Sequence, residues 1–317
     1  MFPTSRSRAV AAAAAGAVLV MTCGCGGGSG SGSGDTVTVT VGFVNGAHSD
    51  FHTCLQGAVE MAAEVAGAEL TTANSQQDPA RELAHIKAMV SQDVDVLIVQ
   101  TVDAEKLKDG IAVARGANVP IFLTSVVGDD TADILGAVVV DLKKAGRLDA
   151  GWVGSDAGGR QVEVGVIAGA PGAASDLLVS GFTEALPPNA KVVVNAPAMF
   201  DPVKAEGVAT RAIRAHPGLD YVFVANEERA LAARDAFDAT GAKGVKIVTI
   251  NGTHRGLAAI KDGRVSATVT NSPLTNGRMA VKNALTLLSD EPAPKIATVP
   301  LTLVTRKNLD HAPPCCP

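Results

Sequence analysis

Short runs of β-branched residues alternate with helical segments along most of this 317-residue chain. In the first such unit, residues 36–44 read Thr-Val-Thr-Val-Thr-Val-Gly-Phe-Val, a run dominated by β-branched residues that predicts a strand. Val59, Ala62, Ala63 and Ala66 then recur at helical spacing. Because parallel strands need long crossover connections, which helices commonly provide, this alternation predicts an α/β fold with a parallel sheet covered on both faces.

The same pattern continues to the end of the chain, and it restarts at Asp141. Further strands are predicted at residues 94–99, 120–124, 162–168, 191–195, 221–225, 245–250, 265–270 and within 296–305. The simplest interpretation is two Rossmann-like lobes, one made of residues 36–140 and 272–302, the other of residues 141–271 and 303–312. The chain would cross between them more than once, and such parallel crossings make a hinge.

Composition sets limits on the class of protein. Hydrophobic residues make up 47% of the chain, enough for two cores, but aromatic residues are only 3%, so alanine, valine, leucine and isoleucine must fill them. The formal net charge is −5, which argues against nucleic acid as a partner.

The amino terminus has the features of a secretory signal. Arg6 and Arg8 precede an uncharged run, residues 9–21, that is too short to span a bilayer. No later run is long and apolar enough to do so. We therefore expect residues 1–24 to be removed and the chain to be exported.

Cys25 follows Gly24, and this pairing resembles the signal of bacterial lipoproteins, in which the cysteine is lipidated and becomes the new amino terminus. Cys23 fits the pattern less well, and cleavage without lipid is the alternative. Residues 25–35 are rich in glycine and serine and would form a flexible tether. The expected attachment to the membrane is by lipid alone.

The remaining thiols are Cys54, Cys315 and Cys316. Three thiols cannot all pair within one chain, and neighbouring cysteines bridge only with strain. The sequence leaves their redox state open.

No catalytic or cofactor-binding motif is apparent. Residues 169–173 lack the lysine and hydroxyl residue of a phosphate-binding loop. His48 and His52 are four residues apart, but a helix is predicted to begin only near His52, so zinc spacing on one helical face is not established. We expect no enzyme activity, no cofactor and no metal.

Amide or hydroxyl side chains recur where predicted strands end. They are Asn45, Gln100, Ser125, Asn226, Asn251 and Asn271. For any one of them a role in a turn is an equal alternative. Together they lie where open α/β sheets bind ligands, and amides both donate and accept hydrogen bonds, so the set predicts a neutral, oxygen-rich ligand. The loop at residues 45–50 joins this set, with Ser49 or Asp50 capping the following helix.

A further set of segments occurs in a recognisable order along the chain, namely residues 49–53, 74–83, 117–121, 141, 200–201, 222–232 and 250–253. Together they resemble the ribose-binding type of periplasmic sugar-binding proteins, the solute receptors of ABC importers. The resemblance spans about residues 36–309. The resemblance implies the type I periplasmic binding protein fold.

Carried over by position, the family's ligand contacts fall on Phe51, His52, Gln100, Ser125, Phe200, Asn226, Asn251 and Asn271. In this interpretation Phe51 and Phe200 stack on the apolar faces of a sugar ring. The family's acid and arginine after the fourth strand are replaced by Ser125 and Val126. Its second-lobe arginine falls on Leu178, and a later acid falls on Asn251. We therefore expect a neutral sugar, polyol or similar small molecule rather than ribose itself.

The resemblance implies a monomeric receptor on the outer face of the cell membrane that closes on its ligand and presents the closed form to an ABC permease. One alternative is presentation to a membrane signalling protein. Another is an effector domain like those of lac-repressor-like proteins, which the export signal and the absence of a basic helix-turn-helix disfavour. An enzyme is the remaining alternative.

Overall fold

A computed structural model describes residues 38–128, 130–199 and 201–317 of the chain. The predicted signal peptide, the predicted lipidation site Cys25, its alternative Cys23 and most of the predicted tether lie outside the described residues, as does Phe200. From Val39 onward the chain forms one compact unit.

The first sheet has six strands in the order β11-β5-β4-β3-β1-β2, and all of its pairings are parallel. Its strands are β1 (Thr40–Asn45), β2 (Glu69–Asn74), β3 (Val96–Gln100), β4 (Ile121–Ser125), β5 (Gly136–Val139) and β11 (Ile296–Thr298).

The second sheet also has six strands, in the order β12-β10-β9-β8-β6-β7. Its strands are β6 (Val162–Ala168), β7 (Ala190–Pro197), β8 (Leu219–Val224), β9 (Lys246–Asn251), β10 (Ala267–Thr270) and β12 (Thr302–Thr305). This sheet is parallel, as predicted, except at its edge, where β12 runs antiparallel to β10.

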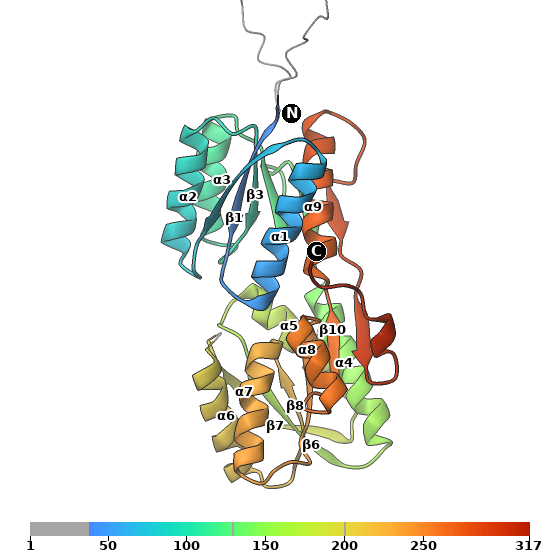
Figure 1. Ribbon diagram of the computed structural model, residues 1–317. Helices are drawn as coiled ribbons and strands as arrows, with labels where there is room; N and C mark the ends of the chain where they lie inside the picture. Colours follow the sequence, from blue (N-terminus) through green and yellow to red (C-terminus); the bar gives the residue numbers. More distant parts are fainter. Residues whose placement is uncertain (1–37, 129, 200) are drawn as a thin grey trace, which may run out of the picture. The chain divides into compact units, whose positions relative to one another are not determined.

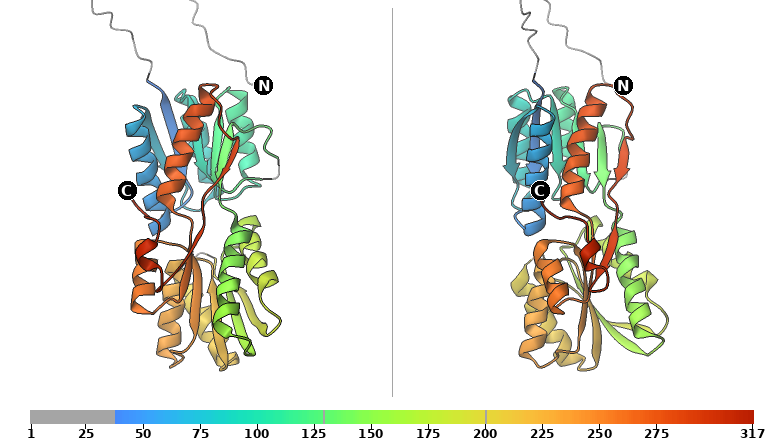
Figure 2. Two further views of the ribbon diagram at one scale, coloured as in Figure 1. Left: turned by 90° about the vertical axis from the view of Figure 1, so that its right-hand side faces the viewer. Right: turned by 45° about the vertical axis from the view of Figure 1, so that its right-hand side comes forward.

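Helices cover both faces of the first sheet (Figure 1). Helices α1 (Asp50–Val65) and α9 (Pro273–Leu288) lie side by side on one face in all views, and α2 (Pro79–Ser91) and α3 (Leu107–Gly116) cover the other (Figure 2). This sheet and its helices are called the first lobe below.

The second lobe consists of the second sheet and five helices. Helices α4 (Leu142–Ala157) and α5 (Ala173–Ala185) pack on one face, and α6 (Pro202–Ala215), α7 (Glu227–Ala239) and α8 (His254–Asp262) on the other. A short 3₁₀ helix, η1 (Leu309–His311), follows β12 and packs beside α8.

Each lobe has an apolar layer on both faces of its sheet, and the few aromatic residues lie deep within these layers. Phe43 and Phe122 on central strands of the first sheet are fully buried. In the second lobe, the rings of Phe182 and Phe223 stack 4.7 Å apart. The aliphatic side chains between them complete the cores, as the composition predicts.

The chain passes between the two sheets three times, at residues 140–141, 271–272 and 299–301. The second of these crossings leads from β10 directly into α9, and Ser272 caps that helix. The three connections are consistent with the repeated crossing predicted from the sequence.

Most predicted elements are present, and the differences have local causes. Strand β5 was not predicted, because it has only four small or β-branched residues with no polar alternation. The end of the strand predicted at residues 94–99 indicates that the next helix begins near residues 100–103, but α3 begins only at Leu107. The Asp103 carboxylate accepts hydrogen bonds from the N–H groups of Glu105 and Lys106 and so forms a turn before the helix. The sequence predicts a helix from Asp141 through Trp152, and the observed helix α4 continues to Ala157.

Helices α4 and α5 approach each other closely at two glycines. A Cβ atom on Gly181 would lie 2.1 Å from the carbonyl oxygen of Lys143, and one on Gly146 would lie 2.3 Å from that of Leu178. We expect Gly181→Ala to lower the free energy of unfolding by about 1–3 kcal/mol through overpacking. Gly151→Ala on exposed α4 surface is the matched control, because nothing lies within 4 Å of its added Cβ.

Denaturant titration of both variants tests this close packing. Gly151→Ala should be neutral or stabilising, since alanine favours a helix by about 0.5–1 kcal/mol. Equal stability of the two variants would contradict close packing at Gly181.

Candidate functional site

Three predicted site residues end neighbouring strands of the first sheet. Asn45 is the last residue of β1, Gln100 of β3 and Ser125 of β4. Since β1, β3 and β4 are adjacent and parallel, the three side chains are brought to one edge of the sheet.

Hydrogen bonds tie the loop after β1 to this edge. The Gln100 Oε1 atom accepts from the Gly46 N–H at 3.0 Å, and the Asn45 Nδ2 atom donates to the His52 carbonyl at 2.9 Å. Ser49 caps α1 by accepting from the backbone N–H of His52. The loop predicted to contact ligand is therefore held in a fixed conformation.

His52 is neutral at physiological pH. Its Nδ1 atom lies 2.7 Å from Ser49 Oγ. Burial lowers the pKa of His52 to about 4, a hydrogen bond with the Gln100 side chain acts in the opposite direction, and the charge of Arg229 lowers the pKa further. A neutral imidazole can both donate and accept a hydrogen bond, which suits a hydroxyl group.

The low pKa of His52 gives a pH prediction. The folded state holds this proton less tightly than the unfolded state, so His52 contributes stability above about pH 6.5 that is lost as the pH falls toward 4. In an NMR titration the His52 ring signals should stay constant from pH 8 to 5 and shift with a midpoint near 4. A midpoint near 6.5 would contradict a buried neutral ring.

Three asparagines occupy the corresponding edge of the second sheet. Asn251 ends β9, Asn271 directly follows β10, and Asn226 follows β8 and caps α7 by accepting from the Arg229 N–H at 3.1 Å. Strands β8, β9 and β10 are neighbours, so these asparagines are also brought together.

The backbone is strained at one site residue in each lobe. Ser125 has φ of 78° and Asn251 has φ of 130°, a region that residues other than glycine rarely adopt. Such conformations cost about 1–3 kcal/mol each and cluster at ligand sites.

Two amide oxygens at these edges are buried without a hydrogen-bond partner among the described residues. They are Oδ1 of Asn45 in the first lobe and Oδ1 of Asn271 in the second. An unsatisfied buried acceptor is costly, and a ligand hydroxyl would satisfy it.

A buried carboxyl group, Glu227, organises the second edge. It follows Asn226 and accepts hydrogen bonds from the N–H groups of Gly252 and Thr253 at 2.8 and 2.7 Å, and from the hydroxyls of Thr253 and Thr268. Burial raises the pKa of Glu227 to about 7, while these four donors act in the opposite direction. Glu227 thereby fixes the loop that follows Asn251 against the start of α7.

The two edges face each other. The N–H of Asp50 at the start of α1 donates to Glu228 Oε1 at the start of α7, at 3.1 Å. The Asp50 carboxylate also pairs with Arg255 of α8 at 3.5 Å. These contacts place the residues next to Asp50, namely Phe51 and His52, opposite those next to Glu228, namely Asn226 and Arg229.

Of the two predicted aromatic contacts, the structure describes only Phe51. Phe51 is 6% exposed, packs in the first lobe's core and lies edge-on to the His52 ring at 5.5 Å. Phe200 lies outside the described residues. Leu178, where the family's arginine was expected, is buried in the apolar core.

Sequence reasoning assigned no role to Glu227, Glu228 and Arg229, or to Asn276 of α9, which donates to the Ser125 hydroxyl at 3.2 Å. The run of charged residues after Asn226 was the available signal, but charge alone does not distinguish a solvated helix start from a buried one. Arg229 is buried, and burial lowers its pKa to about 10, so it stays charged.

Within the described residues, no helix combines the length and the apolar character needed to cross a bilayer.

Comparison with known proteins identifies the family. The family model described as periplasmic binding protein domain matches residues 41–292. A ribose import binding protein of Bacillus subtilis is 28% identical over 83% of this chain and 86% of its own length. A fructose import binding protein of Bifidobacterium longum is 29% identical over 74% of this chain and 75% of its own length.

Solved structures of related binding proteins have the same fold as this chain. A Mycobacterium smegmatis protein in complex with β-D-fucofuranose is 26% identical with a TM-score of 0.81, covering 87% of this chain and 94% of that one. A second structure is the binding protein of an arabinose ABC transporter from Shewanella sp. ANA-3, bound to α- and β-L-arabinofuranose. It is 26% identical, with a TM-score of 0.80, and the match covers 86% of this chain and 94% of that one. These relatives bind solutes and are not enzymes. The chain belongs to the ribose-binding-type family of periplasmic sugar-binding proteins.

Proposed function

We propose that this protein is the extracytoplasmic solute receptor of an ABC importer and that it captures a neutral sugar or polyol between its two lobes. The observation that carries this proposal is the pair of facing, amide-lined sheet edges, each with a buried amide oxygen that lacks a partner among the described residues. A polyhydroxylated ligand supplies the donors that these oxygens need.

The chemistry of the edges supports a neutral ligand. His52 is uncharged, and Ser125, Leu178 and Asn251 replace the charged contacts expected from the family. Arg229 is the exception, but Glu228 and Asp201 lie close enough to raise its pKa, so its charge is locally balanced. Related proteins named for ribose, fructose and xylitol define the chemical range to be tested.

The proposed ligand contacts are the eight residues inferred from the resemblance: Phe51, His52, Gln100, Ser125, Phe200, Asn226, Asn251 and Asn271. We add Asn45, because its free oxygen lies at the same edge. In this proposal the first lobe comprises residues 36–140 and 272–302, and the second comprises residues 141–271 and 303–312. A ligand that contacts both favours their closed arrangement through hinge motion at the three crossings.

The proposed cellular arrangement rests on the amino-terminal sequence. Residues 1–24 would be a lipoprotein signal, and lipidated Cys25 would hold the receptor at the outer face of the membrane. A membrane permease would be the partner of the closed form.

Native mass spectrometry of the purified protein tests the proposal. A neutral sugar or polyol that copurifies would appear as a discrete added mass that is lost on unfolding. Conversion of that molecule into a product during incubation would indicate an enzyme instead.

Asn271→Ala should separate binding from stability. Because its Oδ1 atom has no partner among the described residues, removing it leaves no known protein donor unsatisfied, and the free energy of unfolding should not fall appreciably. Sugar affinity should fall by about 1–3 kcal/mol, or about 5- to 150-fold. Calorimetry with the identified sugar measures this loss. Asn195→Ala on exposed edge strand β7 is the control, and equal affinity of the two variants would remove Asn271 from the site.

A further inference from the structure

Residues 306–317, called the strap segment below, lead from the second lobe to the first. They follow β12, which pairs with β10, and η1 within them packs beside α8. The segment then meets the crossing between β10 and α9, where the Ser272 hydroxyl donates to the Pro314 carbonyl at 2.7 Å and the Leu274 N–H donates to the Cys315 carbonyl at 3.0 Å.

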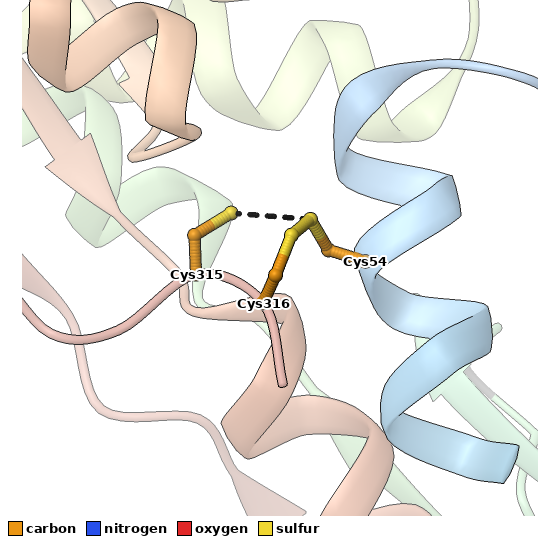
Figure 3. A group of neighbouring side chains, drawn as sticks. All are labelled: Cys54, Cys315 and Cys316. Carbon is orange, nitrogen blue, oxygen red and sulfur yellow. Dashed lines mark hydrogen bonds between the residues drawn. A yellow bond between two sulfur atoms is a disulfide. The ribbon is translucent and has the colours of Figure 1, made fainter. Parts of the chain in front are cut away.

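The strap segment ends on α1. Cys316 forms a disulfide with Cys54 of α1 (Figure 3). Pro317 lies against Gly57, three residues farther along that helix. The sulfur of the remaining thiol, Cys315, lies 3.6 Å from Cys54 Sγ. The disulfide therefore adds a fourth covalent connection between the lobes to the three chain crossings.

This connection lies close to the candidate site. Cys54 lies about one helical turn after Asp50, the first residue of α1, and Phe51 and His52 lie between them. Asp50 makes the contacts to Glu228 and Arg255 of the second lobe. A restraint on Cys54 therefore acts on the segment that joins the two edges.

We propose that the Cys54–Cys316 disulfide is a redox-controlled strap that limits how far the two lobes can separate. An exported protein meets oxidising conditions in which such a bond persists. A dithiol reductant cleaves it by exchange: the protein's disulfide is reduced to two thiols, and the reductant is oxidised to its own disulfide. The strap segment is then joined to the first lobe only by non-covalent contacts.

Cys315 can take the place of Cys316 without an external oxidant. Attack of the Cys315 thiolate on Cys54 Sγ forms a Cys54–Cys315 bond and releases the Cys316 thiolate, so no net oxidation occurs. Burial raises the pKa of Cys315 to about 11, so little thiolate is present at neutral pH and this exchange is slow. Either disulfide, Cys54–Cys316 or Cys54–Cys315, holds the strap segment on α1. A single substitution therefore prevents both disulfides only if it replaces Cys54.

Small-angle X-ray scattering of the sugar-free protein tests the proposal, and its result does not depend on sugar binding. The oxidised protein should shift to a larger radius of gyration when dithiothreitol is added, and should return to its original value on reoxidation. Cys54→Ser should match the reduced protein with or without dithiothreitol. Cys315→Ser, the matched control, should behave like the wild type.

Hydrogen exchange provides a second readout that does not rely on a variant's folding. The amides of Ala312, Cys315 and Cys316 should exchange about tenfold faster or more after reduction, while those of the central strand β8 should not change. Identical scattering and exchange before and after reduction would overturn the proposal. Peptide mapping of the oxidised protein that finds Cys54 unpaired would also overturn it.

Discussion

Glu227→Ala is expected to lower the free energy of unfolding by about 3–5 kcal/mol and to abolish measurable sugar binding. The truncation leaves two backbone N–H groups, those of Gly252 and Thr253, and two threonine hydroxyls without their acceptor in a buried region. Each orphaned donor costs about 1–3 kcal/mol unless water reaches it. The loop after Asn251 would then lose its position relative to Asn226.

Two further variants distinguish the network from general loss of packing. Glu227→Gln keeps the side-chain size and one acceptor oxygen, but it places an amide NH₂ group against hydrogen-bond donors. We therefore expect it to lower the free energy of unfolding by about half as much as Glu227→Ala. Glu228→Ala alters the neighbouring residue, whose carboxylate accepts only the Asp50 N–H among the hydrogen bonds described, and should cost about 1 kcal/mol or less. Urea unfolding measures all three, and a Glu227→Ala variant within 1 kcal/mol of wild type would contradict the network's role.

The titration of Glu227 adds a pH signature. Its pKa is about 7 in the folded protein and near 4.5 when unfolded, so the folded state binds this proton more tightly. The corresponding stabilisation is full below about pH 4.5 and is lost as the pH rises through 7. Relative to the non-titrating Glu227→Gln variant, the wild type should therefore lose stability between pH 5 and 7.5. His52 titrates in the opposite sense but is present in both proteins, so its effect cancels.

Cys54→Ser is expected to lower the free energy of unfolding by about 2–5 kcal/mol. The disulfide joins residues separated by 262 positions, and such a cross-link removes much of the conformational freedom of the unfolded chain. Cys315→Ser leaves the disulfide in place and changes one buried sulfur to oxygen, so its cost should be smaller.

Thermal unfolding with and without dithiothreitol checks this second prediction. Reduction should lower the melting temperature of the wild type and of Cys315→Ser, but not that of Cys54→Ser. A wild-type melting temperature that is insensitive to reduction would show that the bond contributes nothing to stability.

The sequence predicted the order of the elements because alternating β-branched runs and helix caps are local signals. Asp78 followed by Pro79 has the cap and the first-turn proline of a helix start, and α2 begins there. Residues 197–202 were expected to form a loop, but α6 already begins at Pro202, with Asp201 as its cap. Strand β5 was missed because its four small or β-branched residues carry little local signal, and its position depends on pairing with β4 and the distant β11.

Some features of the candidate site could likewise be predicted from the sequence, and others could not. The amides at strand ends could be predicted, because the fold brings the carboxyl ends of neighbouring parallel strands to one edge. The neutral state of His52, the acceptor role of Glu227 and the pairing of Cys54 could not, because each depends on burial or on partners far away in the sequence. Glu227 meets donors 25, 26 and 41 residues later, and Cys54 meets Cys316 at a separation of 262.

The most direct test of sugar capture is isothermal titration calorimetry of the oxidised wild type with D-ribose, D-fructose, L-arabinose, xylitol and myo-inositol. We predict saturable one-to-one binding of at least one of these compounds, weakened in Asn271→Ala and unchanged in Asn195→Ala. No binding of any compound by folded protein that carries no copurified ligand would contradict the proposal that facing amides capture a neutral sugar or polyol.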